Sequence, residues 1–285
     1  MRIAAIDFLN PAPLMWDFEH PPLNSILAER YDIQRMLPAE CADRLATGRA
    51  DPKHADLGLV PIAALAMNPS LRILPGCTIA SKKRVRSLLL VHRANQPLAA
   101  LRSVAADTAS RTTLAYARIL FHHWGNPSVP FLPASADLDG MLEHADAAIV
   151  IGDPALLALE ERANRFVRTG QQLSYIELAE AWTSLMHVPF VSAVWSAAHD
   201  SFIDEHVIDD LNKSRIHGLA NIDTLVAEWS NKLPIAEHTI HTYLTSNIHY
   251  VLDKECIEGM NVFFRSAAAV GVLPEYSFST DGLSV

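Results

Sequence analysis

Short apolar runs that alternate with amphipathic stretches constrain the fold of this chain more than any other feature. In the first third, runs typical of buried strands lie at residues 2–6, 56–60, 72–74 and 85–91, with a helical segment at 39–45. The alternation begins again in the middle third, with strands expected at 103–106, 130–132, 147–151 and 190–195 and helices at 111–124 and 154–162. This pattern is typical of a largely parallel sheet, so we expect an α/β fold.

The last third of the chain is mostly helical. Helices are expected at residues 204–216, 221–230, 235–248 and 254–270. Two α/β blocks and a helical return predict two lobes, one built from residues 1–90 and 197–285 and the other from residues 91–196. The strands expected at 85–91 and 190–195 would connect them. A cleft between such lobes is the natural place for a small ligand.

The charge of the chain narrows the classes of partner. Half of the 285 residues are hydrophobic and 19% are charged, so the chain can bury a substantial core. The formal net charge is −9, which argues against unspecific binding of nucleic acid or of an anionic membrane. An anionic ligand therefore needs a local positive site. The sequence leaves the oligomeric state open.

Three features predict a soluble protein of the cytoplasm. No apolar run approaches the ~20 residues that span a bilayer. Asp7 interrupts the N-terminus too early for a secretory signal. Cys41, Cys77 and Cys256 are far apart and odd in number, which fits a reducing compartment and makes disulfides or a structural zinc site unexpected.

Residues 107–113 carry hydroxyl groups and one guanidinium between a strand and a helix. The helix is expected to open close to Ser110, where free backbone N–H groups and the positive end of the helix dipole are exposed. Thr108, Ser110, Arg111 and Thr112 would add donors, and together they make a site suited to a carboxylate or a phosphate. The alternative is simple capping, for which Ser, Thr and Asp are the usual residues.

Asn10 is a second candidate, because it follows the first strand at the edge where open α/β sheets bind ligands. Its amide both donates and accepts hydrogen bonds, although loop asparagines mostly satisfy turn backbone. Gly152 and Asp153 follow another strand, where glycine lets a ligand approach the backbone and the aspartate can cap a helix. Ser87 interrupts an apolar strand, so its hydroxyl needs a partner, either a ligand or a neighbouring carbonyl.

Motifs for other chemistries are missing from the sequence. The chain has 13 histidines but no His-Glu-x-x-His pattern and no cluster of Cys and His, so we expect no metal site. It also has no phosphate-binding Gly-x-x-x-x-Gly-Lys loop, no Gly-x-Gly-x-x-Gly and no Gly-x-Ser-x-Gly. We therefore expect no nucleotide or other cofactor and no serine-hydrolase activity.

Taken together, these segments resemble the chorismate dehydratase family of the futalosine route to menaquinone. The opening Asp7-Phe8-Leu9-Asn10 with Pro13-Leu14 is similar to the family's Ser-Tyr-Leu-Asn-x-x-Pro-Leu. Further matching segments follow in the family's order along nearly the whole chain: 55–61, 74–76, 85–89, 107–112, 151–153, 178–182, 188–190, 193–195 and 243–248. The sequence departs from the family at Asp7 and Phe8, at an apparent insertion over 50–54, and at Ala179.

The resemblance implies a two-lobed type II periplasmic-binding-protein fold working in the cytoplasm. It also implies dehydration of chorismate to 3-[(1-carboxyvinyl)oxy]benzoate, without a cofactor. Asn10 is then the expected catalytic residue. The substrate-binding residues are expected to be Ser87, Thr108, Ser110, Arg111, Thr112, Gly152 and Asp153.

Two alternatives stay open. The sister enzyme, 1,4-dihydroxy-6-naphthoate synthase, shares the fold, but its usual Ser-Pro-Asp-x-Asp-Thr opening is absent here. A non-catalytic cytosolic binding protein for an aromatic carboxylate would use the same cleft. The residues alone do not decide whether Arg111 contacts the substrate or braces the loop from outside.

Overall fold

Two β-sheets organise the computed structural model, which describes residues 1–108, 110–280 and 282–283. The larger sheet has the order β11-β4-β10-β3-β1-β2. Its strands are β1 (Arg2–Ile6), β2 (Asp32–Met36), β3 (Leu57–Pro61), β4 (Arg72–Ser81), β10 (Phe190–Ala197) and β11 (His249–Val251). The smaller sheet has the order β7-β6-β8-β5-β9. Its strands are β5 (Leu88–Arg93), β6 (Val104–Asp107), β7 (Phe131–Ala134), β8 (Ala147–Ile151) and β9 (Leu173–Glu177).

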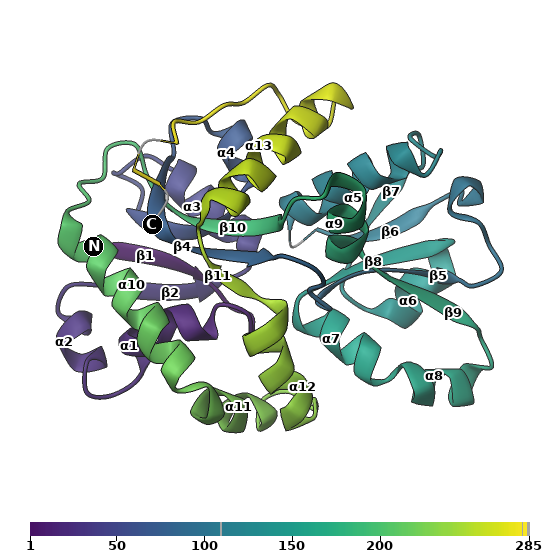
Figure 1. Ribbon diagram of the computed structural model, residues 1–285, viewed down its shortest axis with the longest axis horizontal. Coiled ribbons are helices and arrows are strands. Elements are labelled where there is room, and N and C mark those ends of the chain that lie inside the picture. The colour runs from purple at the N-terminus through teal and green to yellow at the C-terminus, as the bar shows by residue number, and fades with distance from the viewer. Residues whose placement is uncertain (109, 281, 284–285) are drawn as a thin grey trace.

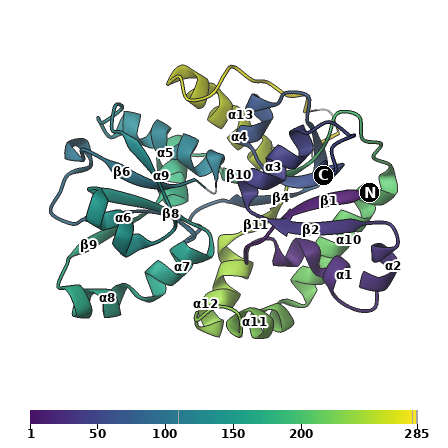
Figure 2. The same cartoon turned by 180° about the vertical axis from the view of Figure 1, so that it is seen from behind.

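Helices cover both sheets, and each sheet forms one lobe with the helices around it (Figures 1 and 2). Around the larger sheet lie α1 (Trp16–Glu19), α2 (Asn24–Ala28), α3 (Pro38–Ala46), α4 (Ala63–Met67), α10 (Glu205–Ala220), α11 (Ile222–Ser230), α12 (Glu237–Thr242) and α13 (Lys254–Ala269). Around the smaller sheet lie α5 (Arg111–His123), α6 (Leu138–His144), α7 (Asp153–Glu160), α8 (Arg162–Thr169) and α9 (Leu178–Met186). The expected two-lobed α/β architecture is confirmed. None of the described helices has the length and apolar character that a membrane span requires.

The strand directions differ from the expectation of largely parallel sheets. β1 pairs in parallel with β2 and β3, and β6 pairs in parallel with β7 and β8. The strands that follow each passage between lobes run the other way: β10 is antiparallel to β3 and β4, and β5 is antiparallel to β8 and β9. Both sheets are therefore mixed.

The chain passes between the two sheets twice, at residues 82–87 and 187–189. Arg86 and His187, one in each connection, have positive φ angles of 65° and 57°. Such angles are uncommon for residues other than glycine, so the path of each connection is held by its surroundings. β10 pairs within the larger sheet, so residues 190–197 belong to the sheet of the first lobe. The division at residues 91–196 stays a prediction.

An aromatic cluster packs where the lobes meet. Tyr116 of α5 stacks on Phe190 of β10 with ring centroids 3.9 Å apart, and lies 4.3 Å from Phe263 of α13 and 4.6 Å from Trp182 of α9. All four rings are fully buried, and the Tyr116 hydroxyl accepts a hydrogen bond from the Val191 N–H at 3.2 Å. Buried aromatic contacts of this kind add to the apolar stabilisation. They join elements of both lobes.

Candidate active site

A narrow cavity with room for about 20 Å³, roughly the space of one water molecule, lies between the two sheets. Its walls come from both lobes and include four residues that the sequence singled out: Asn10, Ser87, Ser110 and Gly152. Much of the remaining wall is apolar, and none of the described residues that line it carries a charged side chain. Recognition of an anion here therefore depends on hydroxyl, amide and backbone N–H groups.

Asn10 lies in the loop after β1, just before a 3-10 turn at Ala12–Met15. Its Oδ1 atom is buried and accepts no hydrogen bond from the described part of the chain. Leaving a buried amide oxygen unpaired costs ~1–3 kcal/mol. A hydroxyl or N–H donor on a bound ligand would remove this cost.

Ser87 ends the first lobe connection, and its side chain is buried. Its Oγ accepts a hydrogen bond of 2.8 Å from the hydroxyl of Tyr243, while its carbonyl accepts one of 2.8 Å from the Gly152 N–H. Burial raises the pKa of Tyr243 well above its usual value, so the phenol stays a donor. Since the Tyr243 proton is committed to Ser87, the Ser87 hydroxyl keeps its own proton for another acceptor.

Tyr243 opens a π-helical turn, Tyr243–Asn247, that follows α12. Such turns are frequent at functional sites. The sequence pattern predicts one continuous helix over 235–248 and no role for Tyr243. A single sequence carries no signal that would place this residue beside Ser87.

Gly152 and Asp153 hold the Asn10 loop from the second lobe. Gly152 has φ 72°, and a Cβ atom there would lie 2.9 Å from the Phe8 ring, so only glycine fits. Asp153 begins α7, and its Oδ1 accepts a hydrogen bond of 3.1 Å from the Leu9 N–H. Burial raises the pKa of Asp153 to about 6, although this hydrogen bond acts in the opposite direction. Asp153 thus joins the two lobes through this hydrogen bond and does not line the cavity.

Ser110 is the N-cap of α5, as the alternative interpretation predicted. Its Oγ accepts hydrogen bonds from the N–H of Thr113 at 3.3 Å and from the Thr113 hydroxyl at 3.2 Å. Ser110 also lines the cavity, so both interpretations apply to the same residue. Together with the start of α7, the start of α5 brings the positive end of a helix dipole to the cavity.

The other predicted residues of this segment lie away from the cavity wall. The Thr112 Oγ1 atom accepts a hydrogen bond of 3.0 Å from the N–H of Ala63, at the start of α4 in the other lobe. Arg111 forms an ion pair of 2.9 Å with Asp43 of α3, on the surface. Thr108 is exposed. The Arg111 guanidinium thus pairs with Asp43 and does not line the cavity, and its contact with a substrate stays a prediction. Ala109, within the same segment, lies outside the described residues.

A two-lobed mixed α/β chain with a cavity between its sheets has the fold of the periplasmic binding proteins. A Candida albicans protein described as having the generic periplasmic-binding-protein fold matches with a TM-score of 0.64, 14% identity, 97% coverage of this chain and 92% of that one. The alkanesulfonate-binding protein SsuA from Xanthomonas axonopodis pv. citri, bound to MOPS, matches with a TM-score of 0.63, 15% identity and coverage of 96% and 94%.

The chain belongs to the menaquinone biosynthesis family, whose model matches residues 1–269. A curated relative, the chorismate dehydratase of Thermus thermophilus, is 25% identical over 263 residues. The match covers 88% of this chain and 91% of the relative. The family resemblance seen in the sequence is thus confirmed.

Proposed function

We propose that this protein removes water from chorismate to give 3-[(1-carboxyvinyl)oxy]benzoate, as a carbon–oxygen lyase. Family membership and the chorismate dehydratase of Thermus thermophilus support this reaction. The observation that carries it is the buried, unpaired Oδ1 of Asn10 at an uncharged cavity where two helices begin. The family expectation of a cytoplasmic enzyme fits the three unpaired cysteines.

The reaction loses the proton of ring carbon 3 and the hydroxyl of carbon 4, and a double bond between these carbons completes an aromatic ring. The carbon 3 proton is acidified through the diene to the ring carboxylate, so negative charge develops there. Stabilising this charge is the main electrostatic task. Backbone N–H groups at the start of α5, with Ser110, suit one of the two substrate carboxylates. The Ser87 hydroxyl suits the other, since the Gly152 N–H already donates to the Ser87 carbonyl.

The described residues that line the cavity include no histidine, aspartate or glutamate to act as a general base. A carboxylate of chorismate itself, held beside carbon 3, would take the proton. Asn10 would orient that carboxylate or the departing hydroxyl group. Contacts between the lobes would keep bulk water out of the closed cavity.

Replacing Asn10 tests this assignment. Asn10→Ala should lower kcat for chorismate by about a hundredfold or more, while calorimetry still detects binding of chorismate. Asn164→Ala, the same change at an exposed position of α8, is the matched control and should leave both unchanged. An unaltered kcat in Asn10→Ala would remove Asn10 from the mechanism. Chorismate binding to the wild-type protein without turnover would favour a binding protein instead.

A further inference from the structure

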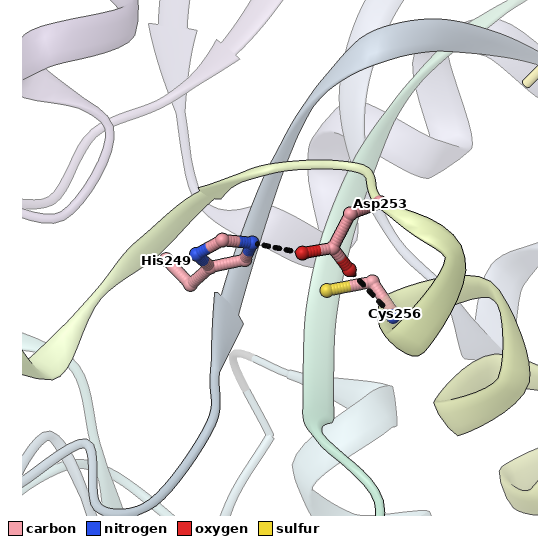
Figure 3. A group of neighbouring side chains, drawn as sticks. All are labelled: His249, Asp253 and Cys256. Carbon is pink, nitrogen blue, oxygen red and sulfur yellow. Dashed lines mark hydrogen bonds and ion pairs between the residues drawn. The ribbon is translucent and has the colours of Figure 1, made fainter. Parts of the chain in front are cut away.

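His249, Asp253 and Cys256 form a cluster outside the cavity, where β11 leads into α13 (Figure 3). Their ligand atoms, an imidazole nitrogen, a carboxylate oxygen and a sulfur, all lie within 4.8 Å of one another. His249 and Asp253 are partly exposed, and Cys256 is buried. The cluster is not predictable from the sequence by motif, because its residues form neither a His-Glu-x-x-His pattern nor a group of Cys and His.

The two carboxylate oxygens of Asp253 have different partners. Oδ1 accepts the hydrogen bond of 2.9 Å from the Cys256 N–H that caps α13. Oδ2 lies 2.8 Å from the Nε2 of His249 and 2.8 Å from the ammonium of Lys82. One oxygen therefore caps the helix, and the other lies beside the imidazole of His249 and the ammonium of Lys82.

In this structure the ammonium of Lys82 supplies the positive charge beside Asp253. Its ammonium also lies 2.7 Å from the Glu255 carboxylate, and its side chain is 40% exposed. A flexible lysine at the surface can leave such a position at small cost, because exposed ion pairs contribute little. The carboxylates of Asp253 and Glu255 would then be free to receive a cation in place of the Lys82 ammonium.

We propose that His249, Asp253 and Cys256 bind a borderline divalent cation, with Zn²⁺ the best match. Imidazole, carboxylate and thiolate are the protein ligands that zinc prefers, and three of them leave the fourth tetrahedral position for water or Glu255. On binding, the cation displaces the Lys82 ammonium, the Cys256 thiol releases its proton to solvent, and His249 coordinates through its neutral ring. No electron transfer is involved.

The position of the site indicates a structural or regulatory use. Lys82 begins the first connection between the lobes. Together with Glu255 and Glu258 it lines a recess of about 410 Å³, which His187 and Pro189 of the second connection also line. A cation held by β11 and α13 would therefore lie next to both connections. It would lie apart from Asn10 and the cavity.

Cobalt(II) titration of the full chain tests the proposal, since bound thiolate gives Co²⁺ an intense near-ultraviolet absorption band that Zn²⁺ then abolishes. We expect this band in the wild-type protein. We expect Cys256→Ser to lose the band and His249→Gln to weaken Zn²⁺ affinity by about a hundredfold or more, as measured by calorimetry. Lys82→Met should strengthen Zn²⁺ binding, because it removes the competing ammonium.

Cys41→Ser, the same change at a buried cysteine of α3, is the matched control and should keep the band. Circular dichroism of each variant verifies folding. Absence of the band in the wild-type protein would overturn the proposal. So would a band that survives Cys256→Ser, or cobalt binding without a thiolate component, which would assign the metal to surface histidines.

Discussion

At the scale of single residues, the pair of Tyr243 and Ser87 shows how the fold prepares a donor for a ligand. The two residues are 156 positions apart in the sequence, yet their hydroxyl oxygens lie 2.8 Å apart. Tyr243 is buried and keeps its proton, which it donates to the Ser87 oxygen. The Ser87 hydroxyl therefore directs its own proton away from Tyr243. In the proposed reaction Tyr243 is a positioning residue that acts through Ser87.

Tyr243→Phe should therefore raise KM for chorismate by about tenfold, equivalent to ~1.4 kcal/mol, with a smaller fall in kcat. The lost hydrogen bond should also lower the free energy of unfolding by ~0.5–1.5 kcal/mol in urea denaturation. Tyr250→Phe is the control, because Tyr250 is equally buried but its hydroxyl has no hydrogen-bond partner in the described structure. Equal KM values in the two variants would refute a role for Tyr243.

At the scale of elements, the start of α5 combines a cap with a binding surface. Ser110 caps the helix through Thr113 and lines the cavity. Asp204 caps α10 in the same way, through the Val207 N–H at 3.1 Å, but does not line the cavity. Comparing variants of the two caps therefore distinguishes an effect on helix stability from an effect on ligand binding.

Ser110→Ala and Asp204→Ala should each lower the free energy of unfolding by ~1 kcal/mol, because each removes an N-cap. We expect only Ser110→Ala to weaken chorismate binding as well, measured by calorimetry under identical conditions. If both variants bound chorismate like the wild type, Ser110 would be a cap alone.

Elements also show where sequence reasoning succeeds and fails. The buried strands and long helices were predicted because their apolar periodicity is strong. The unpredicted strands β2, β9 and β11 are all edge strands, which have fewer apolar positions. The expected helix over 235–248 ends instead in a π-helical turn, because tertiary contacts such as Tyr243 with Ser87 override the local pattern. Cavity residues were predictable because they lie at the ends of predicted strands. The ion pair of Arg111 with Asp43 was not predictable, because it joins two helices that are distant in the sequence.

At the scale of the whole molecule, polar contacts join the lobes beside the cavity. Leu9 donates to Asp153, and Ala63 donates to Thr112. The Asp153 contact is sensitive to pH, because burial raises its pKa to about 6. An unfolded aspartate has a pKa near 3.9, so between these values the folded protein holds a proton that the unfolded chain has lost.

The free energy of unfolding should therefore fall as pH rises from about 4 to 6 and then level off with respect to this group. Asp153→Asn, which keeps an acceptor for Leu9, should flatten that fall and be the more stable form at pH 7. Asp209→Asn, at an exposed position of α10, is the control and should keep the wild-type slope. Urea denaturation over pH 4–7 measures all three proteins. A slope that persists in Asp153→Asn would assign it to another group.

The product that the protein forms from chorismate decides whether the interlobe cavity carries out the proposed dehydration. Pure protein incubated with chorismate, without added metal or cofactor, should convert it to a species that has lost one water. Mass spectrometry and the aromatic proton signals in NMR should identify this product as 3-[(1-carboxyvinyl)oxy]benzoate. Recovery of unchanged chorismate from a protein that binds it would contradict the account.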